Sequence, residues 1–183
     1  MSSASALGVM QLLATQSGAF MAALLIASSA HKLIRRAHTQ AVVQQFAGVP
    51  QGLSAYAVAA VSLVEMLAGV LLIVPAQRAT GAVLAALIWG SYLGLILRAI
   101  AQGRRNVDCG CSFGAAQRPL GVYQVARNAV LLGLATAVGL ESAANVSAAV
   151  PAAQLLGALT FLALYLAIDQ AMALQPMRSG EAL

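Results

Sequence analysis

Charged residues are scarce in this chain of 183 residues: only 8% are Asp, Glu, Lys or Arg, whereas 61% are hydrophobic. Soluble domains typically carry about 25% charged residues. A chain with a third of that share has too little polar surface to cover its apolar side chains in water, which excludes an ordinary soluble domain. The composition predicts an integral membrane protein with the lipid bilayer as its surroundings.

Proline is also sparse, and all five prolines flank apolar runs of membrane-spanning length. A hydrocarbon core about 30 Å thick is crossed by about 20 helical residues. Five such runs occur, and none shows the alternation typical of a barrel strand. We therefore predict an all-α fold, a polytopic membrane helix bundle in a single domain, with about five transmembrane helices at residues 17–34, 53–74, 79–97, 120–140 and 152–172.

Small residues recur at a spacing of four within two of these runs. Gly90 and Gly94 form one such pair, and Gly133 and Ala137 form another. This spacing lets helix backbones approach closely. We expect both pairs to pack inside the bundle, without implying a dimer.

The net charge of +5 does not indicate a nucleic-acid partner, because the basic residues sit in short loops without interleaved aromatic residues. Positive charge favours the cytoplasmic side of a membrane. Taken alone, this rule places the connections after the first and third spans in the cytoplasm. The opposite side has only Arg78. The basic residues in or next to the two connections are Lys32, Arg35, Arg36, Arg98, Arg104, Arg105 and Arg118.

Cysteine is nearly absent, and the only two residues, Cys109 and Cys111, are separated by a single glycine in the polar connection between the third and fourth spans. A disulfide across one residue is far from relaxed geometry and should exchange easily. It would also close almost no loop and add little stability. The pair therefore predicts thiol–disulfide chemistry. Asp108 either raises the thiol pKa or accepts a proton, and both roles remain open.

Cations near the cysteines should favour the reactive thiolate form. Helix parity puts the connections after the first and third spans on the same face of the membrane. The segment after the first span can therefore fold over the cysteine turn. The residues expected to stabilise the thiolate are Lys32, Arg35, Arg36, Arg104 and Arg105.

Two charges fall inside apolar runs, Glu65 in the second and Arg127 in the fourth. Each is costly in hydrocarbon, so we expect both to face the bundle interior and find partners there. One interpretation is an ion pair that locks two helices together. The other is a quinone or proton site, in which Glu65 handles a proton, Arg127 holds an oxygen, and Trp89 or Tyr92 packs against a ring.

Three sequence features together resemble the family of methylamine-utilisation protein MauE, a group of DoxX-like membrane proteins. They are the motif DCGCSFG, the run SSAHKL at residues 28–33, and Arg127-Asn128. The usual family motif is CGCFG, and here Ser112 is inserted before Phe113. The resemblance implies a bacterial inner-membrane protein that helps methylamine dehydrogenase mature. The expected client is the disulfide-rich small subunit of that enzyme, and the expected companion is a membrane-anchored thioredoxin-like protein.

The resemblance extends in architecture to vitamin K epoxide reductases, which oxidise thiols beside a quinone in a four-helix core. It implies the same core here, with a quinone as the candidate cofactor. Those enzymes relay electrons through a second cysteine pair, which this chain lacks. The relay is therefore expected to come from the partner protein.

Three functions remain open at this point. The first is a redox component, whether or not the chain is itself a thiol–disulfide oxidoreductase, and the second is an assembly scaffold without redox activity. The third is a metal carrier using His31 and His38 with the cysteines, although we predict no metal site. Because disulfide chemistry persists in the periplasm and not in the cytosol, we expect the cysteine pair to be periplasmic, against the charge bias.

Overall fold

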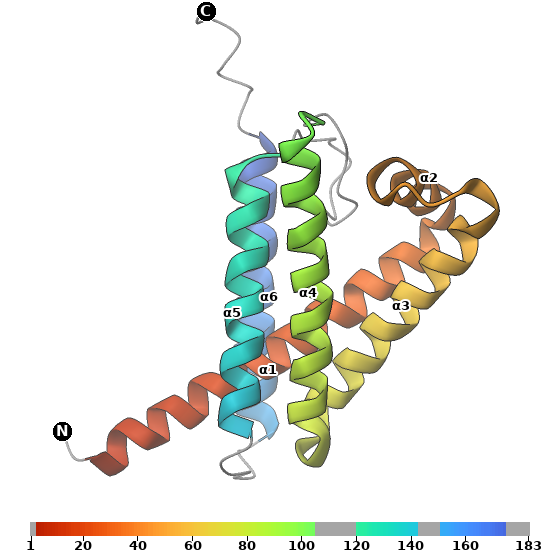
Figure 1. The fold of residues 1–183 in the computed structure, drawn as a ribbon. Helices are drawn as coiled ribbons and strands as arrows, with labels where there is room; N and C mark the ends of the chain where they lie inside the picture. The colour runs from red at the N-terminus through yellow and green to blue at the C-terminus, as the bar shows by residue number, and fades with distance from the viewer. Residues whose placement is uncertain (1–2, 105–119, 143–150, 175–183) are drawn as a thin grey trace, which may run out of the picture.

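The computed structural model describes residues 3–104, 120–142 and 151–174, and the regular structure in these ranges is entirely helical. The chain is a helical membrane bundle, as the composition predicts (Figure 1). Its elements are α1 (Ser3–Ile34), α2 (Arg36–Ala47), α3 (Gln51–Ile73), the 3-10 turn η1 (Pro75–Gln77), α4 (Arg78–Ala101), α5 (Val122–Ser142) and α6 (Pro151–Leu174).

Each of the five expected spans falls on one long helix, and the prolines set several of the boundaries. Pro50 immediately precedes α3, Pro75 opens η1, and Pro151 is the first residue of α6. A proline fits the first turn of a helix because its missing N–H has no helical acceptor there. The first helix begins at Ser3 rather than at residue 17. Residues 3–16 are rich in Ala and Leu, which favour a helix, and include no proline to stop it.

Four helices form the core of the bundle. α1 packs on α3, α3 on α4, α4 on α5, and α5 on α1, which closes a ring. The predicted four-helix core is therefore present, and α6 lies outside the ring against α1. The buried apolar side chains come from all four ring helices and include Met21, Leu25, Leu72, Ala85, Trp89, Leu131 and Val138.

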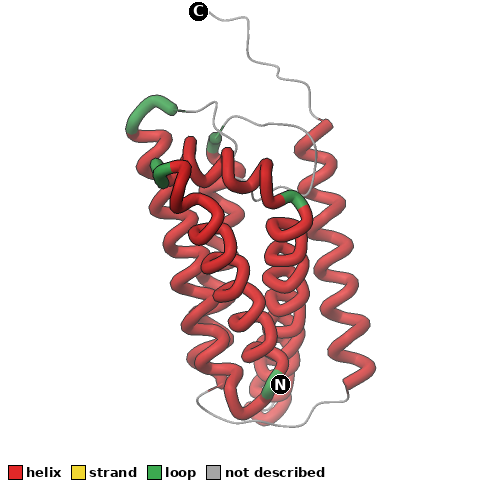
Figure 2. The backbone as a smooth tube through the Cα atoms, turned by 90° about the vertical axis from the view of Figure 1, so that its right-hand side faces the viewer, coloured by secondary structure: helices red, strands yellow, loops and turns green. Residues whose placement is uncertain are grey.

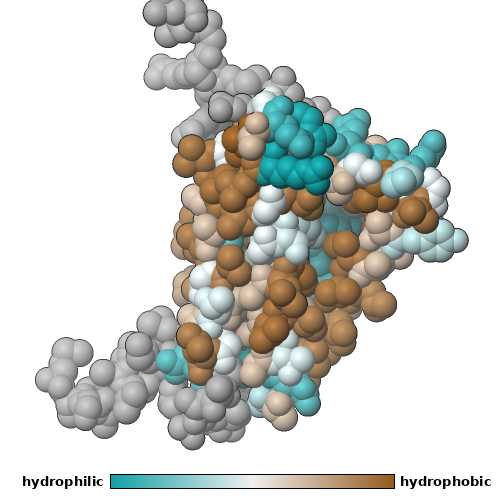
Figure 3. Space-filling view, viewed as in Figure 1, coloured by the Kyte–Doolittle hydropathy of each residue, from teal (hydrophilic) through white to brown (hydrophobic). Residues whose placement is uncertain are grey.

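Apolar side chains also cover the outer faces of the helices (Figure 3). Leu63, Leu87 and Val130 are each more than 60% exposed, which in a bilayer means contact with lipid. Three segments among the described residues are long and apolar enough to cross a membrane, Thr15–Ile34, Gln51–Ile73 and Pro75–Ala101. A shorter apolar stretch, Leu156–Ala171, belongs to α6.

The short helix α2 caps one end of the bundle. Its side chains Val42 and Phe46 are buried against the last turns of α4 and against Leu120, just before α5. Arg104, just after α4, donates a hydrogen bond from Nη1 to the backbone oxygen of Gln45 at 2.9 Å. Both described ends of the connection between α4 and α5 therefore contact α2.

Close helix packing occurs at other glycines than those expected. A Cβ at Gly81 would lie 2.6 Å from the backbone nitrogen of Leu72 in α3, and Gly69 packs against α1 in a similar way. A Cβ at Gly94 or Gly133 would meet nothing within 4 Å. The packing prediction is thus wrong for Gly94 and Gly133, because spacing alone does not say which side of an apolar helix meets a neighbour.

Candidate functional site

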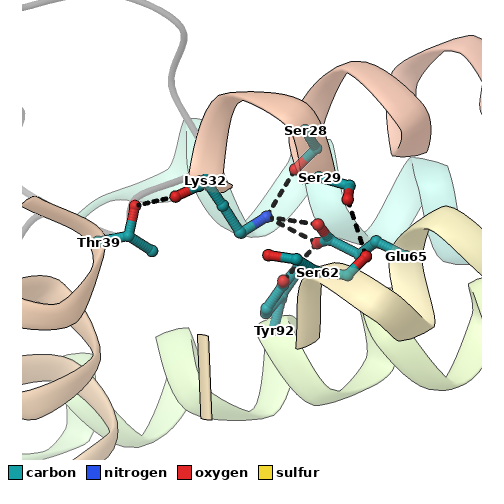
Figure 4. A network of polar contacts seen from close by, with 7 residues as sticks. All are labelled: Ser28, Ser29, Lys32, Thr39, Ser62, Glu65 and Tyr92. Atoms are coloured by element: carbon teal, nitrogen blue, oxygen red, sulfur yellow. Dashed lines mark hydrogen bonds and ion pairs between the residues drawn. The ribbon is translucent and has the colours of Figure 1, made fainter. Parts of the chain in front are cut away.

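A buried ion pair joins α1 to α3. Lys32 Nζ lies 2.7 Å from Glu65 Oε1 and 2.8 Å from Oε2 (Figure 4). The Lys32 residue is 6% exposed and Glu65 1%. Lys32 comes from the last turn of α1, and Glu65 from within α3, its neighbour in the ring. The partner of the Glu65 carboxylate is thus Lys32, which was predicted from the sequence to stabilise the cysteine thiolate.

The Lys32 ammonium and the Glu65 carboxylate also form hydrogen bonds with neighbouring side chains. Lys32 Nζ donates to Ser28 Oγ at 2.6 Å, one turn earlier in α1. The Tyr92 hydroxyl of α4 donates to Glu65 Oε1 at 2.5 Å, and Lys32 Nζ lies 5.5 Å from the centre of the Tyr92 ring. Buried charges repay their desolvation only when geometry is good and further hydrogen bonds are present, and both conditions hold here.

Serines extend the network along the crossing of α1 and α3. Ser29 Oγ donates to the backbone oxygen of Ser62 at 2.8 Å, and both residues are fully buried. Ser62 and Glu65 are three residues apart in α3, and Ser28 and Lys32 are four apart in α1, so each pair shares one helix face. The polar faces of the two helices therefore meet each other and avoid the lipid.

A second buried ion pair joins α5 to α6. Arg127 Nη1 lies 3.5 Å from Asp169 Oδ1, and the Tyr123 hydroxyl donates to the same oxygen at 3.4 Å. The expectation that Glu65 and Arg127 find partners inside the bundle is confirmed, and they do so in two separate pairs. Asp169 was not predicted. The available signal was its place as the single acidic residue in the run 152–172.

The four residues predicted to form a cofactor site, Glu65, Trp89, Tyr92 and Arg127, all line one small cavity between the two ion pairs. Its volume is about 30 Å³. That is room for a water molecule, whereas an engineered protein cavity that binds benzene measures about 150 Å³. The cavity is therefore large enough for a water molecule between polar groups, but it is too small to enclose a quinone ring.

The residues predicted to stabilise a thiolate occupy different environments. Lys32 points into the bundle towards Glu65, whereas Arg35 and Arg36 are exposed at the junction of α1 and α2. Arg104 holds α2 through its hydrogen bond to Gln45. The other predicted residues of the redox site lie outside the described residues, namely Arg105, Asp108, Cys109 and Cys111.

Helix parity predicts that the connections after the first and third spans lie at the same end of the bundle. α2 directly follows α1, and its buried side chains pack against the last turns of α4 and against Leu120, so these two connections lie at the same end of the bundle. Among the residues that the structure describes, His, Cys, Asp and Glu form no group of three that could hold a metal ion.

Comparison with known proteins gives the family. The model of a family described as methylamine utilisation protein MauE matches residues 10–141, which is more than half of the chain. The chain belongs to the MauE family. It is also 31% identical over 149 residues to the methylamine utilization protein MauE of Paracoccus denitrificans, an alignment that covers 80% of each chain. No solved structure matches this MauE-family chain.

The matched region covers nearly all of the candidate site in this MauE-family chain. It includes the ion pair of Lys32 and Glu65, the phenol of Tyr92, and the guanidinium of Arg127. Asp169, in α6, lies beyond the matched residues. The matched region therefore covers the four-helix ring together with the connection that contains the cysteines.

Proposed function

We propose that this MauE-family protein is the membrane component of a thiol–disulfide pathway that supports maturation of a periplasmic amine dehydrogenase. The observation that carries the proposal is the Cys109-Gly110-Cys111 pair, the only cysteines of the chain, in the connection between α4 and α5. Both described ends of that connection contact α2, which carries exposed basic residues at its start. The pathway is that of methylamine utilisation, by analogy with the relative's name.

The partner is a thioredoxin-like protein anchored in the same membrane. A single pair of cysteines can exchange its disulfide with one other protein at a time, and the chain has no second pair to pass electrons on. The client is the small subunit of methylamine dehydrogenase or a similar disulfide-containing protein. Because its disulfides persist only in an oxidising compartment, the pair faces the periplasm of the bacterial inner membrane.

Replacing one cysteine should trap the partner. In a Cys109→Ser or Cys111→Ser variant, the remaining thiol cannot resolve the mixed disulfide by internal attack. We expect one of the two variants to accumulate a reductant-sensitive adduct, visible on non-reducing gels and identified by mass spectrometry. The matched control is the Cys109→Ser/Cys111→Ser double variant, which forms no adduct. Normal dehydrogenase maturation in the double variant would instead support an assembly scaffold.

Arg104 should raise the reactivity of the reduced cysteines, because a nearby cation favours the thiolate. We expect Arg104→Gln to slow their alkylation at neutral pH by a membrane-impermeant maleimide added to intact spheroplasts. Arg104→Lys should restore the rate if charge is the cause. Arg78→Gln, at the opposite end of α4, is the control and should leave the rate unchanged. Equal rates in all variants would remove Arg104 from the site, and labelling only after lysis would place the cysteines in the cytoplasm.

A further inference from the structure

The corner where α1 meets α2 places exposed apolar side chains directly beside exposed basic ones. Leu33 and Ile34, in the last turn of α1, are 50% and 81% exposed. Arg35 and Arg36 follow immediately, and both are exposed. Figure 2 shows α2 as a short helix that lies across the ends of the long helices. The outward surface therefore changes from apolar to cationic within one turn, where the chain leaves its membrane-spanning direction.

Hydrogen bonds fix the direction of the chain at this corner. The buried Thr39 hydroxyl, in the first turn of α2, donates to the backbone oxygen of Arg35 at 3.1 Å. Lys32, one turn before Arg36, is held inside the bundle by its ion pair with Glu65. The charge of Lys32 is therefore used inside the bundle, whereas the two arginines remain at the surface.

Positive charge at this end of the bundle is not balanced by exposed carboxylates of the described residues. Glu65 and Asp169 are buried, each within an ion pair. Glu141 is in the last turn of α5, at the opposite end of the bundle. The exposed arginines at the α2 end are Arg35, Arg36, Arg98 and Arg104. This end therefore attracts anions from its surroundings.

An exposed aromatic side chain lies at the same depth as the corner. α1 and α3 run in opposite directions from α2, and Ser29 contacts the backbone of Ser62 where they cross. Arg35 follows Ser29 by six residues and Tyr56 precedes Ser62 by six, so both lie about 9 Å from this contact towards the α2 end. Tyr56 is 75% exposed. Tyrosine is enriched at the membrane–water interface, which puts the corner at the level of the lipid headgroups.

We propose that this corner, made of Leu33, Ile34, Arg35 and Arg36, binds the headgroup of an anionic phospholipid of the surrounding bilayer, such as phosphatidylglycerol. The guanidinium groups donate hydrogen bonds to the phosphate, whose oxygens match their fork geometry. The two aliphatic side chains contact the acyl chains of the same lipid. The inference uses neither the cysteines nor the cavity, so it stands independently of the proposed function.

The apolar residues beside the arginines favour a phospholipid over a soluble anion. A phospholipid carries a phosphate and apolar chains in one molecule, and α1 presents apolar and then basic side chains in the matching order. Inorganic phosphate has no apolar part to contact Ile34, and an acidic protein segment would have to displace lipid from it. Figure 3 shows that the apolar sides of the bundle border a hydrophilic surface at this end.

Native mass spectrometry of the full chain in detergent tests the proposal, because it resolves the protein with no lipid, one lipid or two. The dissociation constant of the first lipid is measured for phosphatidylglycerol and for zwitterionic phosphatidylcholine. Arg35→Gln/Arg36→Gln removes both cations, and Arg35→Lys/Arg36→Lys keeps the charge. Arg78→Gln, at the opposite end of α4, is the matched control. All the substituted side chains of the corner are exposed, so circular dichroism should show unchanged folding.

We expect phosphatidylglycerol to bind at least about fivefold more tightly than phosphatidylcholine, and the double Gln variant to lose this preference. The double Lys variant and Arg78→Gln should keep it. Equal affinity for the two lipids, or an equal loss in Arg78→Gln and the double Gln variant, would overturn the proposal. Displacement of phosphatidylglycerol by inorganic phosphate or by poly-glutamate would indicate a soluble anion or an acidic protein as the occupant and would also overturn it.

A second measurement needs no variant. Phosphatidylglycerol with a photoreactive group in its headgroup is cross-linked to the unsubstituted protein in vesicles, and the labelled residues are identified by mass spectrometry. We expect the label at the end of α1 and the start of α2. Labelling confined to other parts of the chain would contradict the proposed site. Because the lipid is present in both leaflets of the vesicles, the result does not depend on which face of the membrane this end occupies.

Discussion

Lys32→Met is expected to destabilise the bundle by about 3–5 kcal/mol, because it leaves the Glu65 carboxylate buried without its cation. Glu65→Gln should have an effect of similar size for the reciprocal reason, since the ammonium then lies buried beside neutral groups. For a chain of this length, each kcal/mol corresponds to roughly 2–4 °C in the midpoint of thermal unfolding. The midpoint is measured in detergent by circular dichroism and by Trp89 fluorescence.

The double variant Lys32→Met/Glu65→Leu tests whether the single variants lose stability because the ion pair is gone or because one charge stays buried without its partner. Both charges are then gone, and apolar side chains fill their place, so most of the lost stability should return. Arg98→Met is the matched control, because it removes an exposed cation of α4 and should change stability by less than about 0.5 kcal/mol. A double variant less stable than either single variant would show that the network stabilises the bundle through more than charge pairing.

Gly81→Ala is expected to force α3 and α4 apart. The added Cβ would lie 2.6 Å from the Leu72 backbone nitrogen and 2.8 Å from the Leu71 backbone carbon. Backbone atoms next to the short η1 connection cannot move aside as a side-chain end can. Overpacking of this kind typically costs about 1–3 kcal/mol and can cost more. The same detergent unfolding experiment measures the loss.

Gly94→Ala, in the same helix, should have the opposite sign. Its new Cβ would meet no atom within 4 Å, so only the helix propensity changes. Alanine is favoured over glycine inside a helix by roughly 0.5–1 kcal/mol. If both variants lose stability equally, the close approach of α3 and α4 at Gly81 is not what holds these helices together.

The positions of the helices could be predicted well from the sequence, for a physical reason. Apolar runs of membrane length between prolines leave the backbone few alternatives, because every N–H and C=O in lipid must be paired within the segment. The helices accordingly coincide with the expected runs to within a few residues, except where α1 extends back to Ser3. The segment after the first span, which is not among the five predicted runs, forms α2 and buries Val42 and Phe46.

Partners across helices were harder to predict. Glu65 and Arg127 stood out as charges in apolar runs, but the cation for Glu65 was Lys32, which had been expected to stabilise the cysteine thiolate. A long lysine side chain can reach inward as well as outward, and the direction depends on which face of α1 meets α3. Asp169 could have been noticed by the same rule that singled out Glu65.

By itself, the sequence determined that this chain is a helical membrane protein, where its helices run, and that its two cysteines are separated by one glycine in a single connection. Only the tertiary structure decided that Lys32 pairs with Glu65 and Arg127 with Asp169, and that a water-sized cavity separates the pairs. The reason is that helices with apolar residues on all sides carry little information about rotation. Their mutual orientation is settled by small residues, by buried charges that must be paired, and by the shapes of the faces that meet.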